Sequence, residues 1–257
     1  MSTPDVIVHP EADVLAKAAA ARLVTRIVDA QASRAHASVV LTGGGIGTAT
    51  LAALAASPAH DAVDWRRLDV WWGDERFVPA GHEDRNETAA RSALLDHVRV
   101  DPARVHAMPA SDGPLGSDPE AAAERYAEEL TAVTRPENHA DVPEFDVLLL
   151  GLGPDGHVAS LFPELPALYE DRSVVAVRGA PKPPPTRISL TLPSIQAARE
   201  VWVLASGQEK ADAVRLALSG AGPVQVPGAG ARGRSRTLFL VDDAAASRLP
   251  DDVRKPR

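Results

Sequence analysis

Cysteine is absent from the 257-residue sequence. Without it the chain can form no disulfide framework, no cysteine-ligated zinc or iron–sulfur site and no cysteine nucleophile. A chain without cysteine fits a reducing compartment, so we expect a cytoplasmic location. No run of apolar residues approaches the length of a membrane-spanning helix, and the first residues do not have the pattern of a secretion signal. We therefore expect no membrane partner.

The sequence also contains fewer basic than acidic residues. The 27 Lys and Arg residues are outnumbered by 35 Asp and Glu residues, which gives a formal net charge of -8. Such a balance argues against a nucleic-acid partner, because binding a phosphate backbone needs a basic face. A site for a small anionic substrate would have to gather cations locally, against the field of the whole protein.

Short apolar runs alternate with longer helical patterns along the chain. Two of these runs, residues 39–41 and 147–150, lack polar alternation, which is typical of central parallel strands covered on both faces. The pattern predicts the α/β class, with a doubly wound, mostly parallel, Rossmann-like sheet and helices on both faces. The predicted strands are residues 6–8, 38–42, 68–72, 105–108, 145–150, 174–178, 187–192, 201–205 and 237–241. The predicted helices are residues 12–30, 48–56, 86–96, 119–133 and 209–219.

No repeat and no long linker divides the chain. We therefore expect a single domain over residues 1–250 and a frayed tail at residues 251–257. The Gly- and Arg-rich segment 224–236 is expected to form a mobile loop. The proline run at residues 181–185 must be extended, because each proline keeps its predecessor out of the helical region.

A glycine turn follows the first buried strand, where residues 42–48 read Thr-Gly-Gly-Gly-Ile-Gly-Thr. Glycines let backbone N–H groups approach a ligand closely, and the N-terminus of a following helix favours an anion. The turn therefore predicts a phosphate cradle, and a tight strand-to-helix turn without a ligand is the alternative. It is not a Walker loop, because no Gly-Lys pair occurs in the chain.

The strand at residues 68–72 leads into the charged cluster 74–76, Asp-Glu-Arg, and then to His82 and Asn86. Ligands of open α/β sheets bind outside the carboxyl ends of strands, where an arginine can clamp a phosphate or carboxylate with two hydrogen bonds. A surface charge cluster is the alternative. No zinc-binding His-Glu-x-x-His motif starts at His82, since position 86 is asparagine, and we expect no metal.

A third strand end is followed by residues 151–157, Gly-Leu-Gly-Pro-Asp-Gly-His. The glycines fit the Gly-x-Gly-x-x-Gly pattern of dinucleotide sites. We reject that function, because Asp155 would place negative charge at the pyrophosphate and Pro163 would cut short the helix that should hold it. Asp155 and His157 instead form a candidate pair in which the histidine is a general base and the carboxylate orients its ring. A solvent-exposed or capping histidine is the alternative.

Two further segments bring cations to predicted strand ends. The proline run delivers Lys182 and Arg187 to the start of a strand, and Lys210 lies in the first turn of a predicted helix. The helix dipole disfavours a cation at that place, so Lys210 suggests an anionic partner. An ordinary solvated lysine is the alternative.

With these motifs in this order, the chain resembles the glucosamine-6-phosphate isomerase/6-phosphogluconolactonase family, and within it the lactonases. The resemblance rests on residues 72–79 with His82 and Asn86, on residues 151–163, on the Pro-Lys-Pro-Pro-Pro-x-Arg run at 181–187 and on Gly207 with Lys210. It implies the α/β fold of glucosamine-6-phosphate deaminase. It also implies hydrolysis of 6-phosphoglucono-δ-lactone in the oxidative pentose phosphate pathway, without a cofactor.

The motifs and the resemblance together define an expected site. His157 takes a proton from water, which attacks the lactone carbonyl, and later returns it to the ring oxygen. Asp155 orients His157, and Asp74 positions the water or a sugar hydroxyl. No Gly-x-Ser-x-Gly elbow is present to supply a covalent nucleophile. The residues expected to bind substrate and its phosphate are Thr42, Gly43, Gly44, Gly45, Arg76, His82, Arg85, Arg187 and Lys210.

Two departures from the family pattern and two alternative functions remain. The family's first loop usually reads Ser-Gly-Gly-Ser-Thr-Pro, so hydroxyl donors are lost here, and Arg85 stands where serine is common. Glucosamine-6-phosphate deaminases share the Asp-Gly-His loop but continue with Phe-Asn-Glu-Pro, whereas this chain has Phe162, which cannot carry a proton, in place of the glutamate. A sugar-phosphate sensing module is the other alternative, and retention of Asp155, His157 and Arg76 argues against it. We expect a monomer or a weak homo-oligomer.

Overall fold

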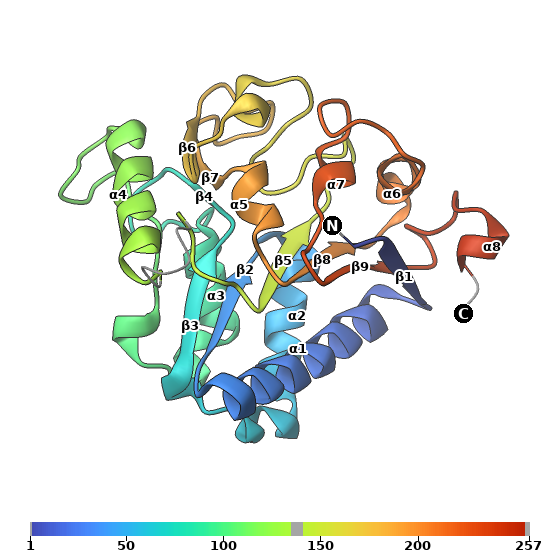
Figure 1. Cartoon of the computed structure of the whole chain (residues 1–257), viewed down its shortest axis with the longest axis horizontal. Coiled ribbons are helices and arrows are strands. Elements are labelled where there is room, and N and C mark those ends of the chain that lie inside the picture. The colour runs from blue at the N-terminus through green and yellow to red at the C-terminus, as the bar shows by residue number, and fades with distance from the viewer. Residues whose placement is uncertain (1, 135–140, 255–257) are drawn as a thin grey trace.

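The structure is a computed structural model that describes residues 2–134 and 141–254. At its centre lies a parallel sheet of six strands in the order β1-β9-β8-β5-β2-β3 (Figure 1). This sheet confirms the predicted doubly wound, mostly parallel α/β fold. The strands are β1 (Pro4–His9), β2 (Ala37–Leu41), β3 (Leu68–Trp72), β5 (Val147–Gly151), β8 (Glu200–Ala205) and β9 (Arg236–Asp242).

The chain changes its direction of travel across the sheet between β2 and β5. From β2 it moves outward to the edge strand β3, and it then returns to the other side of β2 to build β5, β8 and β9 in turn. Open α/β sheets bind their ligands at the carboxyl ends of strands beside such a reversal. The loops that follow β2 and β5 are therefore placed to form the walls of a site.

Helices cover both faces of this sheet. The α-helices are α1 (Ala12–Arg34), α2 (Gly44–Ala56), α3 (Asn86–Ala93), α4 (Pro119–Ala132), α5 (Leu192–Gln196), α6 (Ala211–Leu218), α7 (Pro227–Gly230) and α8 (Asp251–Arg254). Figure 1 shows α1 and α2 below the sheet and α5, α6 and α7 above it. The buried face of α1 repeats every four residues, with Leu15, Ala19, Leu23 and Ile27 facing the core. None of the described helices is long and apolar enough to cross a membrane.

Short 3₁₀ segments connect several of these elements. They are η1 (Pro58–Ala62), η2 (Trp65–Arg67), η3 (Leu95–His97), η4 (Pro102–Arg104), η6 (Pro166–Tyr169) and η7 (Gln208–Lys210). The helices predicted over residues 86–96 and 209–219 are therefore each divided into an α-helix and a 3₁₀ segment.

A second sheet of three antiparallel strands, in the order β4-β7-β6, stands beside the carboxyl ends of the main sheet. Its strands are β4 (Asp74–Arg76), β6 (Val174–Val177) and β7 (Arg187–Leu190). The sequence predicts β6 and β7 as strands but not this separate sheet, because the three residues of β4 are too few to show a pattern. The extended proline run connects β6 to β7 and lets the chain turn back.

Two predicted elements need correction. Helix α2 begins at Gly44 rather than at Thr48. The predicted start was too late because glycines, which have a low helix propensity, form the first turn. Residues 105–108 form no strand, since Val105 makes only an isolated bridge with Val70. The proline at position 109 has no N–H to donate, which prevents a longer ladder there.

Two segments expected to be irregular carry short helices. The 224–236 segment contains α7, and the Gly228 N–H donates to the carbonyl of Gly156 (2.9 Å). This bond ties the segment to the loop that carries His157. Helix α8 lies within the tail expected to be frayed, and residues 255–257 lie outside the described residues.

The hydroxyl of Tyr126 secures the edge of the main sheet. Tyr126 lies on α4 and is fully buried, and its hydroxyl accepts the Trp72 N–H (3.0 Å) and donates to the Trp72 carbonyl (3.2 Å). Because β3 is an edge strand, these backbone groups have no neighbouring strand to pair with. Burial raises the pKa of Tyr126, so the hydroxyl keeps its proton.

Replacing Tyr126 with phenylalanine should destabilise the protein by about 2 kcal/mol, because two buried backbone groups lose their partner. Guanidinium denaturation of the Tyr126→Phe variant measures this loss. Tyr169→Phe is the matched control, since Tyr169 is 66% exposed. Equal denaturation midpoints for the two variants would contradict a bracing function for the Tyr126 hydroxyl.

Candidate active site

A cleft of about 990 Å³ opens at the carboxyl ends of β2, β5 and β8, against the second sheet. The expected site residues that line it are Thr42, Gly43, Gly44, Gly45, Asp74, Arg76, His157, Arg187 and Lys210. Asp155 lies behind His157 and contacts it. His82 and Arg85 do not line the cleft. Loops far apart in the sequence thus bring most of the expected residues together.

The N-terminus of α2 forms the wall after β2. Gly43 is its N-cap, no side chain caps its free N–H groups, and its first turn carries no acidic residue. The partial positive charge of these amides therefore faces the cleft unopposed by the helix itself. Thr42 Oγ1 accepts the Gly151 N–H (3.1 Å), which joins the ends of β2 and β5 and leaves the hydroxyl proton for a ligand. These groups can cradle a phosphate.

Asn86 packs tightly against this glycine turn. A Cβ atom at Gly43 would overlap Asn86 Oδ1, so glycine is required here by close approach. Asn86 begins α3 and donates from Nδ2 to the Asp74 carbonyl (2.8 Å) and to Asp74 Oδ1 (3.2 Å). It therefore connects the α2 N-terminus to Asp74. The sequence marked Asn86 only as part of a motif and assigned it no function.

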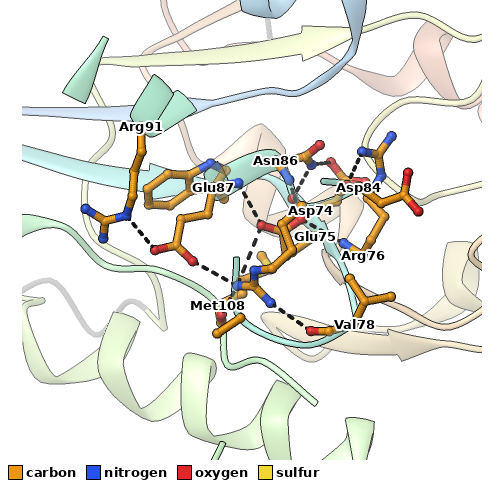
Figure 2. A network of polar contacts seen from close by, with 12 residues as sticks. Asp74, Glu75, Arg76, Val78, Asp84, Asn86, Glu87, Arg91 and Met108 are labelled. Carbon is orange, nitrogen blue, oxygen red and sulfur yellow. Dashed lines mark hydrogen bonds and ion pairs between the residues drawn. The ribbon is translucent and has the colours of Figure 1, made fainter. Parts of the chain in front are cut away.

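Residues 74–76 form strand β4, so their charged side chains point alternately to its two sides (Figure 2). Asp74 and Arg76 face the cleft, and Glu75 points to the opposite side, where it is fully buried. Arg76 Nη1 donates to the carbonyl of Asp84 (2.7 Å). Only two of the three charged residues are therefore available to a ligand.

Glu75 caps the N-terminus of α3, whose own N-cap residue makes no side-chain capping hydrogen bond. Its carboxylate accepts the N–H groups of Asn86 (2.6 Å), Glu87 (2.9 Å) and Arg76 (2.9 Å). Burial raises the pKa of Glu75, and the charge of Arg85 and these N–H groups act in the opposite direction. This carboxylate fixes the start of α3, and with it Asn86.

The expectation that Arg85 contacts phosphate is corrected by its position. Arg85 is only 1% exposed, its Nη2 lies 3.7 Å from Glu75 Oε2, and it does not line the cleft. Its guanidinium donates to the carbonyl of Met108 (2.7 Å) and to Glu87 Oε2 (3.1 Å). A buried arginine needs such partners, and they hold it away from any ligand.

His82 likewise belongs to the loop between β4 and α3 rather than to the cleft. Its Nδ1 accepts the N–H of Asp84 (3.1 Å), and its side chain is 41% exposed. Asp84 is also the residue whose carbonyl holds Arg76. The expected contact of His82 with substrate is therefore replaced by a contact that shapes the loop.

His157 and Asp155 form a directed pair on the loop after β5. His157 Nδ1 lies 2.5 Å from Asp155 Oδ1, and its ring packs on Phe162 with centroids 4.4 Å apart. A Cβ atom at Gly153 would overlap both the His157 ring and the Asp155 carboxylate, so glycine is needed beside them. Among the described residues, Nε2 of His157 has no hydrogen-bond partner. That nitrogen is free to act in the cleft.

The carboxylate of Asp155 is held in its charged form. Burial raises its pKa, but the hydrogen bond and charge of His157 outweigh this effect and lower the pKa to about 2. Asp155 is thus ionised throughout the neutral range. A charged acceptor at Nδ1 places the neutral ring's proton there and makes Nε2 the basic nitrogen.

Two further segments bring cations to the cleft, the proline run with the start of β7 (Lys182 and Arg187) and the end of η7 (Lys210). Arg187 is buried at the start of β7 and donates to the carbonyls of Lys182 (3.0 Å), Pro183 (3.2 Å) and Pro184 (3.1 Å). Burial lowers the pKa of Arg187, and burial followed by the charge of Lys182 lowers the pKa of Lys210. Cations that are desolvated and close to one another favour an anion between them.

The cleft also contains residues to which sequence patterns assigned no function. Ser206 and Glu209 follow β8, and Lys17 of α1 lines the far end. Their places after a strand end could have marked Ser206 and Glu209, whereas nothing local marks Lys17. Ser160 lies buried behind Asp74 and donates to Asp74 Oδ2 (2.7 Å). No group of three His, Asp or Glu side chains within residues 2–134 and 141–254 is arranged to hold a metal.

Comparison with known proteins gives a consistent set of relatives. A family model described as glucosamine-6-phosphate isomerases/6-phosphogluconolactonase matches residues 10–240. A 6-phosphogluconolactonase of Streptomyces coelicolor is 66% identical over 255 residues, covering 99% of this chain and 98% of that protein. One of Mycobacterium tuberculosis is 52% identical, covering 95% of this chain and 97% of that protein. The solved 6-phosphogluconolactonase of Trypanosoma cruzi superimposes with a TM-score of 0.84 at 28% identity, covering 97% and 98% of the two chains.

Inorganic phosphate should raise the pKa of Lys210, because an anion in the cleft offsets the burial and the neighbouring charge that lower it. The chain has four lysines, so ¹³C-dimethylation gives a simple NMR spectrum in which each can be titrated. A Lys210→Arg variant assigns the signal of Lys210. A pKa of Lys210 that stays constant up to high phosphate concentration would contradict an anion site here.

Proposed function

The chain belongs to the glucosamine-6-phosphate isomerase/6-phosphogluconolactonase family, and we propose that it hydrolyses 6-phosphoglucono-δ-lactone to 6-phosphogluconate. The observation that carries this proposal is the free Nε2 of His157, which shares one cleft with an uncapped helix N-terminus and a group of cations. A base and an anion cradle in one cleft suit a substrate that carries both a phosphate and an electrophilic carbonyl. The reaction belongs to the oxidative pentose phosphate pathway.

The residue at position 162 separates hydrolysis from deamination. Phe162 is 1% exposed, its ring contacts His157, and the guanidinium of Arg187 lies 5.8 Å from its centroid. An apolar ring cannot transfer the proton that sugar ring opening needs, but it can pack the base in a fixed position. This supports a lactonase over a glucosamine-6-phosphate deaminase, and the names of the relatives point the same way.

The phosphate of the substrate binds at the N-terminus of α2. Its oxygens accept the free N–H groups of Gly44 and Gly45 and the hydroxyl of Thr42, and the charges of Lys210 and Arg187 neutralise it. Lys182 adds a third positive charge at the rim. Fixing the phosphate in this way orients the lactone carbonyl toward His157. The carbonyl and the base are then held together in the bound complex and need not meet by diffusion.

Hydrolysis proceeds by general-base catalysis without a covalent intermediate. His157 Nε2 removes a proton from water as the water oxygen attacks the carbonyl carbon, and Asp155 stabilises the imidazolium that forms. Arg76 or a backbone N–H stabilises the negative charge on the former carbonyl oxygen. When the ring C–O bond breaks, the imidazolium returns its proton to the ring oxygen, which leaves a hydroxyl group and a carboxylic acid. The acid then loses its proton to solvent to give 6-phosphogluconate.

Asp74 serves as an acceptor for a hydroxyl group of the sugar. Both of its oxygens already accept one hydrogen bond, from Asn86 and from Ser160, and a carboxylate has further lone pairs for a ligand.

The proposal also includes a single domain, a cytoplasmic location, no cofactor and a monomer or weak homo-oligomer.

Replacing His157 with alanine should lower kcat by about 10²- to 10⁴-fold, the usual contribution of a general base, and leave the affinity for 6-phosphogluconate nearly unchanged. Lactone made in situ from glucose 6-phosphate is followed with 6-phosphogluconate dehydrogenase, and product binding is measured by calorimetry. His36→Ala is the control, because His36 is exposed at the opposite end of β2.

Three outcomes can be distinguished. A wild-type protein that fails to exceed the spontaneous rate overturns the lactonase proposal. A His157→Ala variant that retains turnover assigns the base elsewhere. Equal losses of turnover and product affinity would make His157 a binding residue instead.

A further inference from the structure

Ser160 lies in the same loop as His157 but faces away from the cleft. It is fully buried, its hydroxyl donates to Asp74 Oδ2 (2.7 Å), and its N–H donates to Ser189 Oγ (3.2 Å). Ser189 lies on β7 directly opposite Asp74 on β4, and its hydroxyl donates to the carbonyl of Leu190 (2.9 Å). Both polar groups of Ser160 are therefore bound to the second sheet.

The other oxygen of Asp74 leads to the anion cradle. Asp74 Oδ1 accepts from Asn86 Nδ2 (3.2 Å; Figure 2). Asn86 also packs against Gly43 at the N-cap of α2. The carboxylate of Asp74 thus joins the loop of the proposed base on one side to the proposed phosphate cradle on the other. Asp74 and Asn86 are each at most 6% exposed, so water cannot easily replace these bonds.

The backbone between His157 and Ser160 needs such an anchor. Ala159 has a φ of 50°, in the left-handed region that an alanine rarely adopts. A conformation of this kind persists only where the surroundings impose it. The Leu161 N–H closes this turn by donating to the Val158 carbonyl (2.9 Å), and the two hydrogen bonds of Ser160 tie the turn to the second sheet.

We infer that Ser160 is a positioning residue, which acts through Asp74 to set the place of His157 relative to the bound phosphate. This inference rests on the proposed lactonase function. The Ser160 hydroxyl fixes one oxygen of Asp74, so that the remaining lone pairs face the substrate. The same bond holds the His157 loop at the distance where water can lie between Nε2 and the carbonyl carbon.

Replacing Ser160 with alanine should lower kcat by about 10- to 100-fold, the effect of displacing a reacting group by roughly 1 Å. KM should change by less than about threefold, because the phosphate contacts on α2 are untouched. Ser160→Cys keeps the shape of the side chain with a larger atom and a weaker donor, so it should show a smaller loss than Ser160→Ala. Ser38→Ala is the matched control, since Ser38 is also buried and its hydroxyl has no partner among the described residues.

A double-mutant cycle with Asp74→Asn tests the route of the effect. If Ser160 acts through Asp74, then Ser160→Ala changes kcat by less than about twofold in the Asp74→Asn background. A loss as large as in the wild-type background would overturn the inference, and so would full kcat in both Ser160 variants. A wild-type protein without lactonase activity would overturn the proposed function instead, so the two failures are distinguishable.

Discussion

The parallel pairing of β2 with β5 is the contact on which the rest of the site depends. Val39 lies opposite Val147 and Val40 opposite Leu148 in the interior of the sheet. Because the chain winds outward in both directions from this pair, the loops that follow the two strands open side by side. One loop supplies the N-terminus of α2, and the other supplies the proposed base. The distance between them is therefore set by the sheet.

Charge is the second constraint, because an acidic protein must bind an anionic substrate. The chain gathers five cations at the cleft, Lys17, Arg76, Lys182, Arg187 and Lys210, against a net charge of -8. Backbone carbonyls of the proline run stabilise Arg187 in place, so its charge does not depend on a bound anion. Buried carboxylates and their donors hold the surrounding loops. The site is therefore built before the ligand arrives, which reduces the reorganisation that binding needs.

The sequence predicted those parts of the structure that depend on local pattern. Continuous apolar runs identified the parallel strands, and the spacing of Asp155 and His157 identified the pair that the structure brings into contact. The burial of Arg85 could not be predicted, because it depends on side-chain alternation in a strand of three residues and on Glu75 reaching α3. The start of α2 was misplaced because low helix propensity conceals a first turn made of glycines. Contacts such as that of Ser160 with Asp74 join residues 86 positions apart and leave no local signal.

In the proposed mechanism, His157 works as a general base because the ionised Asp155 holds it. The decisive measurement is the pH dependence of kcat/KM for the wild type and for Asp155→Asn. Asp155, with a pKa of about 2, stays ionised across the neutral range, so the difference between the two proteins there reports on its charge. In Asp155→Asn kcat/KM should fall throughout that range, because a neutral amide cannot stabilise the imidazolium that forms as water attacks. Equal kcat/KM for the two proteins across that range would contradict this function of Asp155.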